Sequence, residues 1–140
     1  MPVEMALSRI LIREEHESHI VELREVDGDR VFPIAIGPTE AMAIERRLMD
    51  KAPPRPMTHE LLARVIERLG AEIESIFIND LQDHTFYARL ILQQDGQRID
   101  IDSRPSDAIA LGVATNVPIY VAEHVLDDVC HPPQNSSDSD

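Results

Sequence analysis

The stretch QDGQRIDIDSRPSDAIAL, residues 94–111, has an earlier counterpart in VDGDRVFPIAIGPTEAMAI, residues 26–44. Each contains an Asp-Gly pair, which is a tight hairpin signal, followed by a strand-like run. Each then reaches a proline, Pro38 or Pro105, with an acidic residue two positions later and a helical pattern beyond it. Proline suits the first turn of a helix, and an acidic residue there favours the helix dipole. The two stretches therefore predict a unit of strands and a helix that occurs twice.

The rest of the chain extends this unit in both directions. Residues rich in β-branched and apolar side chains predict strands at 6–12, 19–26, 30–36, 72–79, 85–93 and 97–102, and a strand or strand-to-helix segment at 118–125. Helical spacing predicts helices at 38–50, 59–69 and 104–115. We therefore predict one α+β domain over residues 1–130, with a mixed or antiparallel sheet. A unit of three strands followed by a helix is duplicated in it, roughly over 6–50 and 72–125. The polar tail, residues 131–140, is predicted to be disordered.

The helix predicted at 59–69 carries its own signals. Thr58 is a good N-cap, and Gly70 stands where a helix usually ends. Leu62, Val65, Ile66 and Leu69 fall on one side, which predicts a buried stripe.

Length and charge restrict the function classes. The chain has 140 residues, enough for one domain with a core. No apolar run is long enough to span a membrane, we identify no signal peptide, and Cys130 stands alone, which together predict a cytoplasmic protein. The formal net charge is −13, so the chain should repel nucleic acid unless a metal ion or a local basic patch intervenes.

The densest polar group stands just before the helix at 104–115. In a strand, Asp100 and Asp102 share one face, with Ile99 and Ile101 turned to the core. Asp102 and a nearby Asp107 could hold Mg²⁺ or Mn²⁺, which prefer oxygen ligands.

Spacing alone favours an architectural explanation of the same group. Arg104 could pair with Asp102 or Asp107, and Ser103 or Asp107 could cap the helix. The counterparts of Asp102 and Arg104 in the first copy are Ala35 and Gly37, however. Charge that only one copy carries indicates that the second half holds the site.

Other residues have both a functional and a structural interpretation. His59 is a candidate acid, base or ligand, or else an exposed first-turn residue whose neighbour Glu60 supports Arg64 at i,i+4. Asp80 and Asp83 are candidate ligands or turn formers. One of Phe86 and Tyr87 is expected to point into the core. A basic cluster (Arg46, Arg47, Lys51 and Arg55) could receive an anion or form a solvated helix face.

Four segments in order, IGPTEAMAI, PRPMTHELL, INDLQDHTFYARL and IDSRPSDAIALGVATNVPIYVAE, resemble the bifunctional nuclease family over roughly residues 3–129. The resemblance implies an α+β fold with a duplicated strand–helix unit, and nuclease activity on DNA and RNA. Carried over residue by residue, the polar positions of the family fall on His59, Asp80, Asp102, Arg104, Ser106, Asp107 and Glu123. Ser103 stands where a small residue such as alanine is expected.

Two functions follow as hypotheses. The first is a metal-assisted nuclease, with Asp102 and Asp107 on Mg²⁺ or Mn²⁺, His59 in proton transfer and Arg104 on a phosphate. In this hypothesis Asp80 is a further catalytic residue, and Ser106 binds substrate together with Arg104. The second is a non-catalytic regulatory module that binds a small ligand or a protein at the same place. A homodimer or higher homo-oligomer is expected in either case, because the edges of a small sheet invite pairing.

Overall fold

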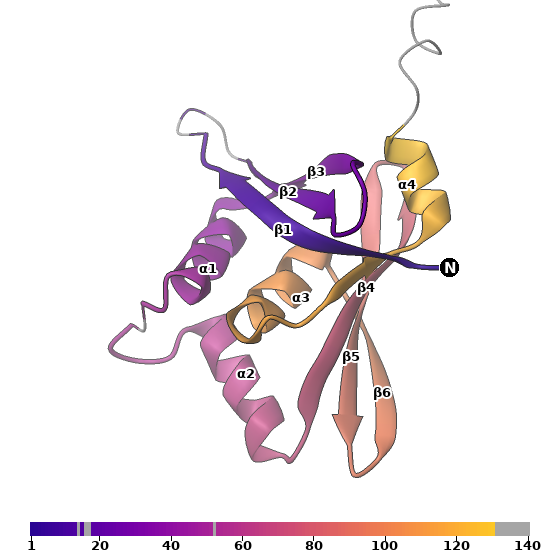
Figure 1. The fold of residues 1–140 in the computed structure, drawn as a ribbon. Helices are drawn as coiled ribbons and strands as arrows, with labels where there is room; N and C mark the ends of the chain where they lie inside the picture. The colour runs from indigo at the N-terminus through magenta and orange to yellow at the C-terminus, as the bar shows by residue number, and fades with distance from the viewer. Residues whose placement is uncertain (14, 16–17, 52, 131–140) are drawn as a thin grey trace, which may run out of the picture.

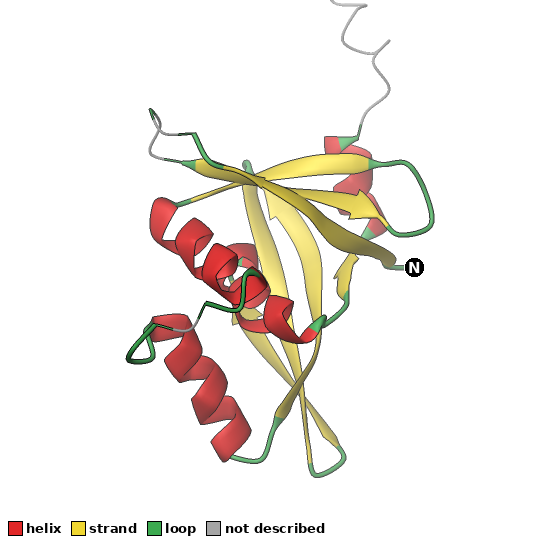
Figure 2. Ribbon diagram, turned by 60° about the vertical axis from the view of Figure 1, so that its left-hand side comes forward, coloured by secondary structure: helices red, strands yellow, loops and turns green. Residues whose placement is uncertain are grey.

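Seven strands in the described part of the chain form one curled sheet, and three helices pack on one of its faces (Figures 1 and 2). The computed structural model describes residues 1–13, 15, 18–51 and 53–130. The strands are β1 (Val3–Leu11), β2 (His19–Glu25), β3 (Val31–Ile36), β4 (Glu72–Gln82), β5 (Thr85–Gln94), β6 (Gln97–Ser103) and β7 (Ile119–Val121). The helices are α1 (Pro38–Leu48), α2 (Thr58–Arg68), α3 (Pro105–Gly112) and α4 (Glu123–Val129), with a 3₁₀ helix, η1 (Val113–Thr115), after α3. The predicted α+β class is confirmed, whereas the predicted disordered tail lies outside the described residues.

The sheet consists of two antiparallel meanders joined by one short strand. The strand order is β3-β2-β1-β7-β4-β5-β6. Strand β7 is antiparallel to Val3–Met5 of β1 and parallel to Ile76–Ile78 of β4, so the sheet is mixed. Three antiparallel strands followed by a helix with proline in its first turn occur twice along the chain. Duplication as the origin of this order stays a prediction.

The core lies between the sheet and helices α1 and α3. Alternate residues of β5 (Ala88, Leu90 and Leu92) are buried on the face that the helices cover, as the period of a strand requires. Seven of the eight residues of α3 are buried, every one except Asp107. The helix is apolar almost all round because it is enclosed by the sheet and by α1 and α2. Phe86 packs on Phe32, with ring centroids 5.7 Å apart, while Tyr87 is exposed, as expected for one of the two aromatics.

Helix α2 corrects the predicted buried stripe. The exposed fractions of Leu62, Val65 and Leu69 are 44%, 43% and 69%, and only Ile66 of the predicted stripe packs against the core. The stripe prediction failed because α2 lies outermost in the helical layer and packs on α3 and β4 through its inner side alone (Figure 2). The residue that α2 does bury is His59, which corrects its interpretation as an exposed first-turn residue.

The ends of α2, β5 and β6 lie where the sequence places residues that favour a positive φ. Helix α2 is followed by Gly70 at a φ of 85°, as predicted, although its N-cap is Met57 and not Thr58. The turn between β5 and β6 places Asp95 and Gly96 at φ values of 51° and 77°. Positive φ at both central residues is the two-residue hairpin turn that Asp-Gly favours.

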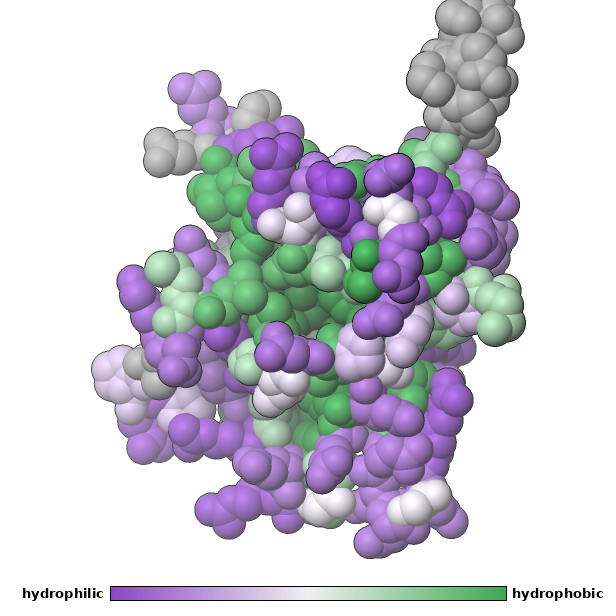
Figure 3. Space-filling view, in the orientation of Figure 1, coloured by the Kyte–Doolittle hydropathy of each residue, from purple (hydrophilic) through white to green (hydrophobic). Residues whose placement is uncertain are grey.

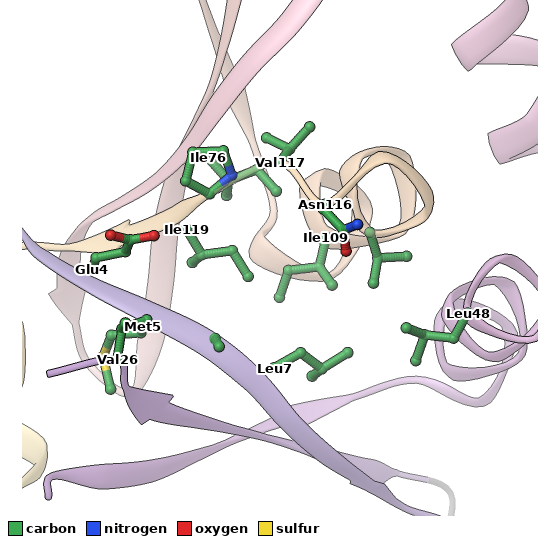
Figure 4. Close-up of a pocket in the computed structure, with 13 residues that line it drawn as sticks. Glu4, Met5, Leu7, Val26, Leu48, Ile76, Ile109, Asn116, Val117 and Ile119 are labelled. Atoms are coloured by element: carbon green, nitrogen blue, oxygen red, sulfur yellow. The ribbon is translucent and has the colours of Figure 1, made fainter. Parts of the chain in front are cut away.

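An apolar hollow of about 240 Å³ opens between β1 and the α3–η1 segment. Figure 3 shows it as a hydrophobic centre surrounded by polar side chains on this face. Leu7, Ile109 and Ile119 line it (Figure 4). The hollow exists because β1 pairs with β7 over only three residues and then runs away from it. No helix among the described residues is long and apolar enough to cross a membrane.

Candidate functional site

A cavity of about 810 Å³ opens where the starts of α2 and α3 face α1 and the end of β6. Its polar lining comes from residues far apart in the sequence. The floor is apolar and includes Leu90 and Leu111, while Ile101 lines the rim. Ile101 was predicted to face the core but is 41% exposed. The reason is that β6 is the edge strand, and its last residues lie beside this cavity and not beneath a helix. The charged or titratable lining residues are Glu40, Arg46, His59, Asp102, Arg104 and Asp107.

Buried His59 and partly buried Asp107 pair on the inner wall of the cavity. His59 Nε2 lies 2.8 Å from Asp107 Oδ1, and the side chain of His59 is 10% exposed. Because a carboxylate only accepts hydrogen bonds, Nε2 carries the proton and donates it. His59 Nδ1 makes no hydrogen bond to any residue that the structure describes. The pair therefore resembles the carboxylate–imidazole arrangement that orients a general base.

Arg104 joins two carboxylates at the rim. Its Nε donates to Asp107 Oδ2 at 2.9 Å, and its Nη2 donates to Glu40 Oε2 at 3.0 Å and to Asp107 Oδ1 at 3.2 Å. Those bonds, to Asp107 first and Glu40 second, raise the pKa of Arg104. The Nη1 group makes no hydrogen bond in the described part of the chain, so it can donate two to a ligand.

Asp107 is held as a carboxylate by these contacts. Its burial raises the pKa of the carboxyl, but the hydrogen bonds from Arg104 and His59 together outweigh burial, so the pKa lies below its ordinary value. Helix α3 has no side-chain cap; Ser103 Oγ donates instead to the Arg104 carbonyl at 2.8 Å. The predicted cap by Ser103 or Asp107 is therefore wrong, and of the two predicted partners of Arg104 the structure has Asp107.

A second ion pair attaches α1 to α2 at the opposite rim. Arg46 Nε donates to Glu60 Oε2 at 3.2 Å, and Glu60 Oε1 accepts from the Met57 N–H at 3.2 Å. Burial raises the pKa of Glu60, but the hydrogen bonds from Arg46 and from the backbone lower it by more, so the net shift is downward. Glu60 thus pairs with Arg46 and not with Arg64 as expected, because α1 lies close enough to supply the partner.

The structure brings together only some of the predicted site residues. His59, Arg104 and Asp107 are in direct contact, and Asp102 lines the same cavity from β6 as an exposed side chain. Ser106 is buried and lines a different hollow. Asp80 lies elsewhere, on β4, where it accepts hydrogen bonds from Gln82 and from its own neighbour's backbone, which lower its pKa.

Asp80 and Glu123 form ion pairs elsewhere on the surface. Asp80 Oδ1 also lies 3.3 Å from His124 Nε2 of α4. Glu123, at the start of α4, pairs with Arg30 at 3.3 Å. Neither pair lines the cavity that holds His59.

Sequence reasoning missed Glu40 and the pairing of Arg46. Glu40 had a signal, because it is the counterpart of Asp107 in the first copy and both begin a helix. Since α1 and α3 pack side by side, their equivalent first-turn acids come close enough to share Arg104. Arg46 belonged to the predicted basic cluster, but nothing in the sequence paired it with Glu60.

The carboxylates do not form a metal-ligand set. Among residues 1–13, 15, 18–51 and 53–130, no group of three or more His, Cys, Asp or Glu side chains is placed to hold a metal ion. Both oxygens of Asp107 already accept hydrogen bonds, and Asp102 is exposed on the edge strand. What the cavity offers is an oriented imidazole, a guanidinium with a free donor edge, and an apolar floor.

Comparison with known proteins matches one domain family over most of the chain. The family model of the bifunctional nuclease domain matches residues 21–134. An uncharacterized protein of Mycobacterium tuberculosis is 41% identical over 123 residues, which cover 88% of this chain and 73% of that protein. Bifunctional nuclease 1 of Oryza sativa is 28% identical over 118 residues, or 81% of this chain and 36% of the rice protein. Bifunctional nuclease 2 of Arabidopsis thaliana is 22% identical over 79% of this chain and 34% of its own length.

Proposed function

Because the chain belongs to the bifunctional nuclease family, we propose that it hydrolyses phosphodiester bonds of DNA or RNA in the cavity beside His59. The observation that carries this proposal is the pair of buried His59 with Asp107, next to Arg104, whose Nη1 makes no hydrogen bond among the described residues. The names of the rice and Arabidopsis relatives support nuclease chemistry. The chain spans about a third of the length of these plant proteins.

His59 is the proposed general base. With Nε2 donating to Asp107, the lone pair of Nδ1 is available to accept a proton from water. The water oxygen then bonds to phosphorus, the P–O bond to the leaving nucleoside breaks, and the departing oxygen takes a proton from the imidazolium or from solvent. Asp107 fixes the ring and stabilises the imidazolium that forms.

Arg104 is the proposed phosphate contact. Asp107 and Glu40 hold its guanidinium in place through Nε and Nη2, so Nη1 presents both of its donors without losing much side-chain freedom on binding. A cation held in this way stabilises the charge that develops on the phosphoryl oxygens.

Divalent metal stays a prediction. The described residues give little support to Mg²⁺ or Mn²⁺ on Asp102 and Asp107, because both Asp107 oxygens already accept hydrogen bonds and no group of three or more His, Cys, Asp or Glu side chains is gathered there. We therefore assign every step above to side chains and leave the metal requirement to measurement.

The test is cleavage of labelled single-stranded DNA and RNA by the full chain, in Mg²⁺, in Mn²⁺ and in chelator. Substituting His59→Ala should lower the cleavage rate about 10²–10⁴-fold, the usual contribution of a general base. The matched control is His124→Ala, which removes a second Asp-paired histidine outside the cavity and should cleave like the wild type. Equal cleavage by all three proteins would indicate a contaminant, and loss only in His124→Ala would move the site to Asp80.

A non-catalytic module that binds a small ligand or a protein is the second candidate, and the net charge of −13 favours it. A purified chain that cleaves neither polymer under any metal condition, yet binds a ligand with an affinity that Arg104→Ala reduces, would support it.

A further inference from the structure

Helix α2 carries an apolar surface that nothing described in this chain covers. Leu61, Leu62, Val65 and Leu69 have exposed fractions of 54%, 44%, 43% and 69%. The adjacent side of the helix, with Ala63 and Ile66, packs against the core. We call the four exposed residues the α2 stripe. Monomeric proteins rarely expose a contiguous row of four large apolar side chains to water.

The spacing of the stripe indicates what covers it. Leu62, Val65 and Leu69 are separated by three and then four residues, the repeat with which one helix packs along another. A partner helix with the same pattern is therefore the best fit. The α2 helix of a second copy has that pattern by definition, and a twofold axis lets one patch bind itself.

Charge favours the same partner. Residues 38–70, which contain α1 and α2, hold six of the 13 Lys and Arg residues (Arg46, Arg47, Lys51, Arg55, Arg64 and Arg68) against five acidic ones (Glu40, Glu45, Asp50, Glu60 and Glu67). Two copies of a chain with a net charge of −13 repel each other over most of their surfaces. The surface of residues 38–70 is the exception, because its basic and acidic residues nearly balance. Nucleic acid fits the stripe poorly, since its phosphates bind cationic and hydrogen-bonding groups, which the apolar side chains of the stripe lack.

We propose that two copies of this chain pair through the α2 stripe about a twofold axis. The surface is continuous with the cavity, because Leu62 belongs to the stripe and also lines the cavity with Met57, which is 50% exposed. Met42 and Ile101, 57% and 41% exposed, extend the apolar rim. A second copy on the stripe therefore stands beside the cavity mouth and narrows the approach of a substrate.

The test is sedimentation velocity of the full chain over a range of concentrations. The wild type should be a dimer, and Leu69→Glu should raise the dimer dissociation constant at least about 30-fold, because it places an unpaired charge in an apolar interface. Ile12→Glu is the control, since Ile12 is also half-exposed, at 48%, but precedes β2 and lies outside the stripe. A wild type that is monomeric throughout, or that associates only when an oligonucleotide is added, would overturn the proposal. So would a Leu69→Glu protein that dimerises like the wild type.

A cysteine cross-link keeps the proposal testable if Leu69→Glu does not fold. Near a twofold axis, Val65 of one copy stands close to Val65 of the other. Mild oxidation of a Val65→Cys, Cys130→Ser protein should give a covalent dimer, and Ile12→Cys, Cys130→Ser should not. Cross-linking at position 12 and none at position 65 would contradict the proposed interface.

Discussion

The hydrogen bond between His59 and Asp107 should contribute more to stability than the pair between Arg104 and Asp107, although both end on the same carboxylate. The side chain of His59 is 10% exposed, that of Asp107 30%, and that of Arg104 64%. A buried hydrogen bond to a charged group contributes about 1.5–3 kcal/mol, whereas an exposed ion pair contributes about 0.2–1 kcal/mol. Burial therefore decides the order of the two contributions.

Double-mutant cycles measure the two contributions separately. The free energy of unfolding in urea is determined for the wild type, for His59→Ala, Arg104→Ala and Asp107→Ala, and for the two doubles that include Asp107→Ala. The coupling free energy for His59 with Asp107 should be about 1.5–3 kcal/mol, and that for Arg104 with Asp107 below about 1 kcal/mol. The cycle of His124 with Asp80, a more exposed His–Asp pair, is the control and should also stay below about 1 kcal/mol. A His59 coupling no larger than that control would refute the argument from burial.

Three further predictions concern pH and packing. The lowered pKa of Asp107 means that its carboxylate stabilises the fold fully above the ordinary value of 3.8, and that this contribution is lost as pH falls through the lower folded-state pKa. The stability difference between wild type and Asp107→Asn should therefore shrink in urea titrations between pH 6 and pH 3; a constant difference would contradict the linkage. Gly112→Ala should cost about 1–3 kcal/mol by thermal or urea unfolding, because the added Cβ would stand 3.0 Å from Ile76 Cδ1 and 3.1 Å from Val117 Cβ. An unchanged midpoint would mean that these neighbours move freely. Ile109→Ala, at a fully buried site of α3, should cost about 2–5 kcal/mol, and a loss below about 1 kcal/mol would show that the site collapses around the smaller side chain.

The sequence predicted the elements well because their signals are local. Alternation of apolar residues, Asp95-Gly96 between two strands, and proline before Thr39 or Ser106 each act within a few positions. Even so, η1 and the split of residues 118–125 into β7 and the start of α4 needed the structure, since those short elements are set by what they pack against.

The site was predictable only in part because its contacts cross the chain. His59 and Asp107 are 48 residues apart, and Arg104 and Glu40 are 64 apart, so no spacing rule pairs them. The prediction of a buried stripe on α2 failed for a related reason: periodicity identifies an apolar side of a helix but does not say whether this chain or another covers it.

Strand β7 has a consequence for how the protein is made. It is the last of the described strands along the chain but lies in the interior of the sheet, between β1 and β4. Until residues 119–121 leave the ribosome, the edges at Val3–Met5 and Ile76–Ile78 have no partner, and each can pair with a foreign strand. During translation the two meanders therefore stay unconnected in the sheet until β7 pairs with both. A nascent chain halted before residue 119 exposes both of those edges at once.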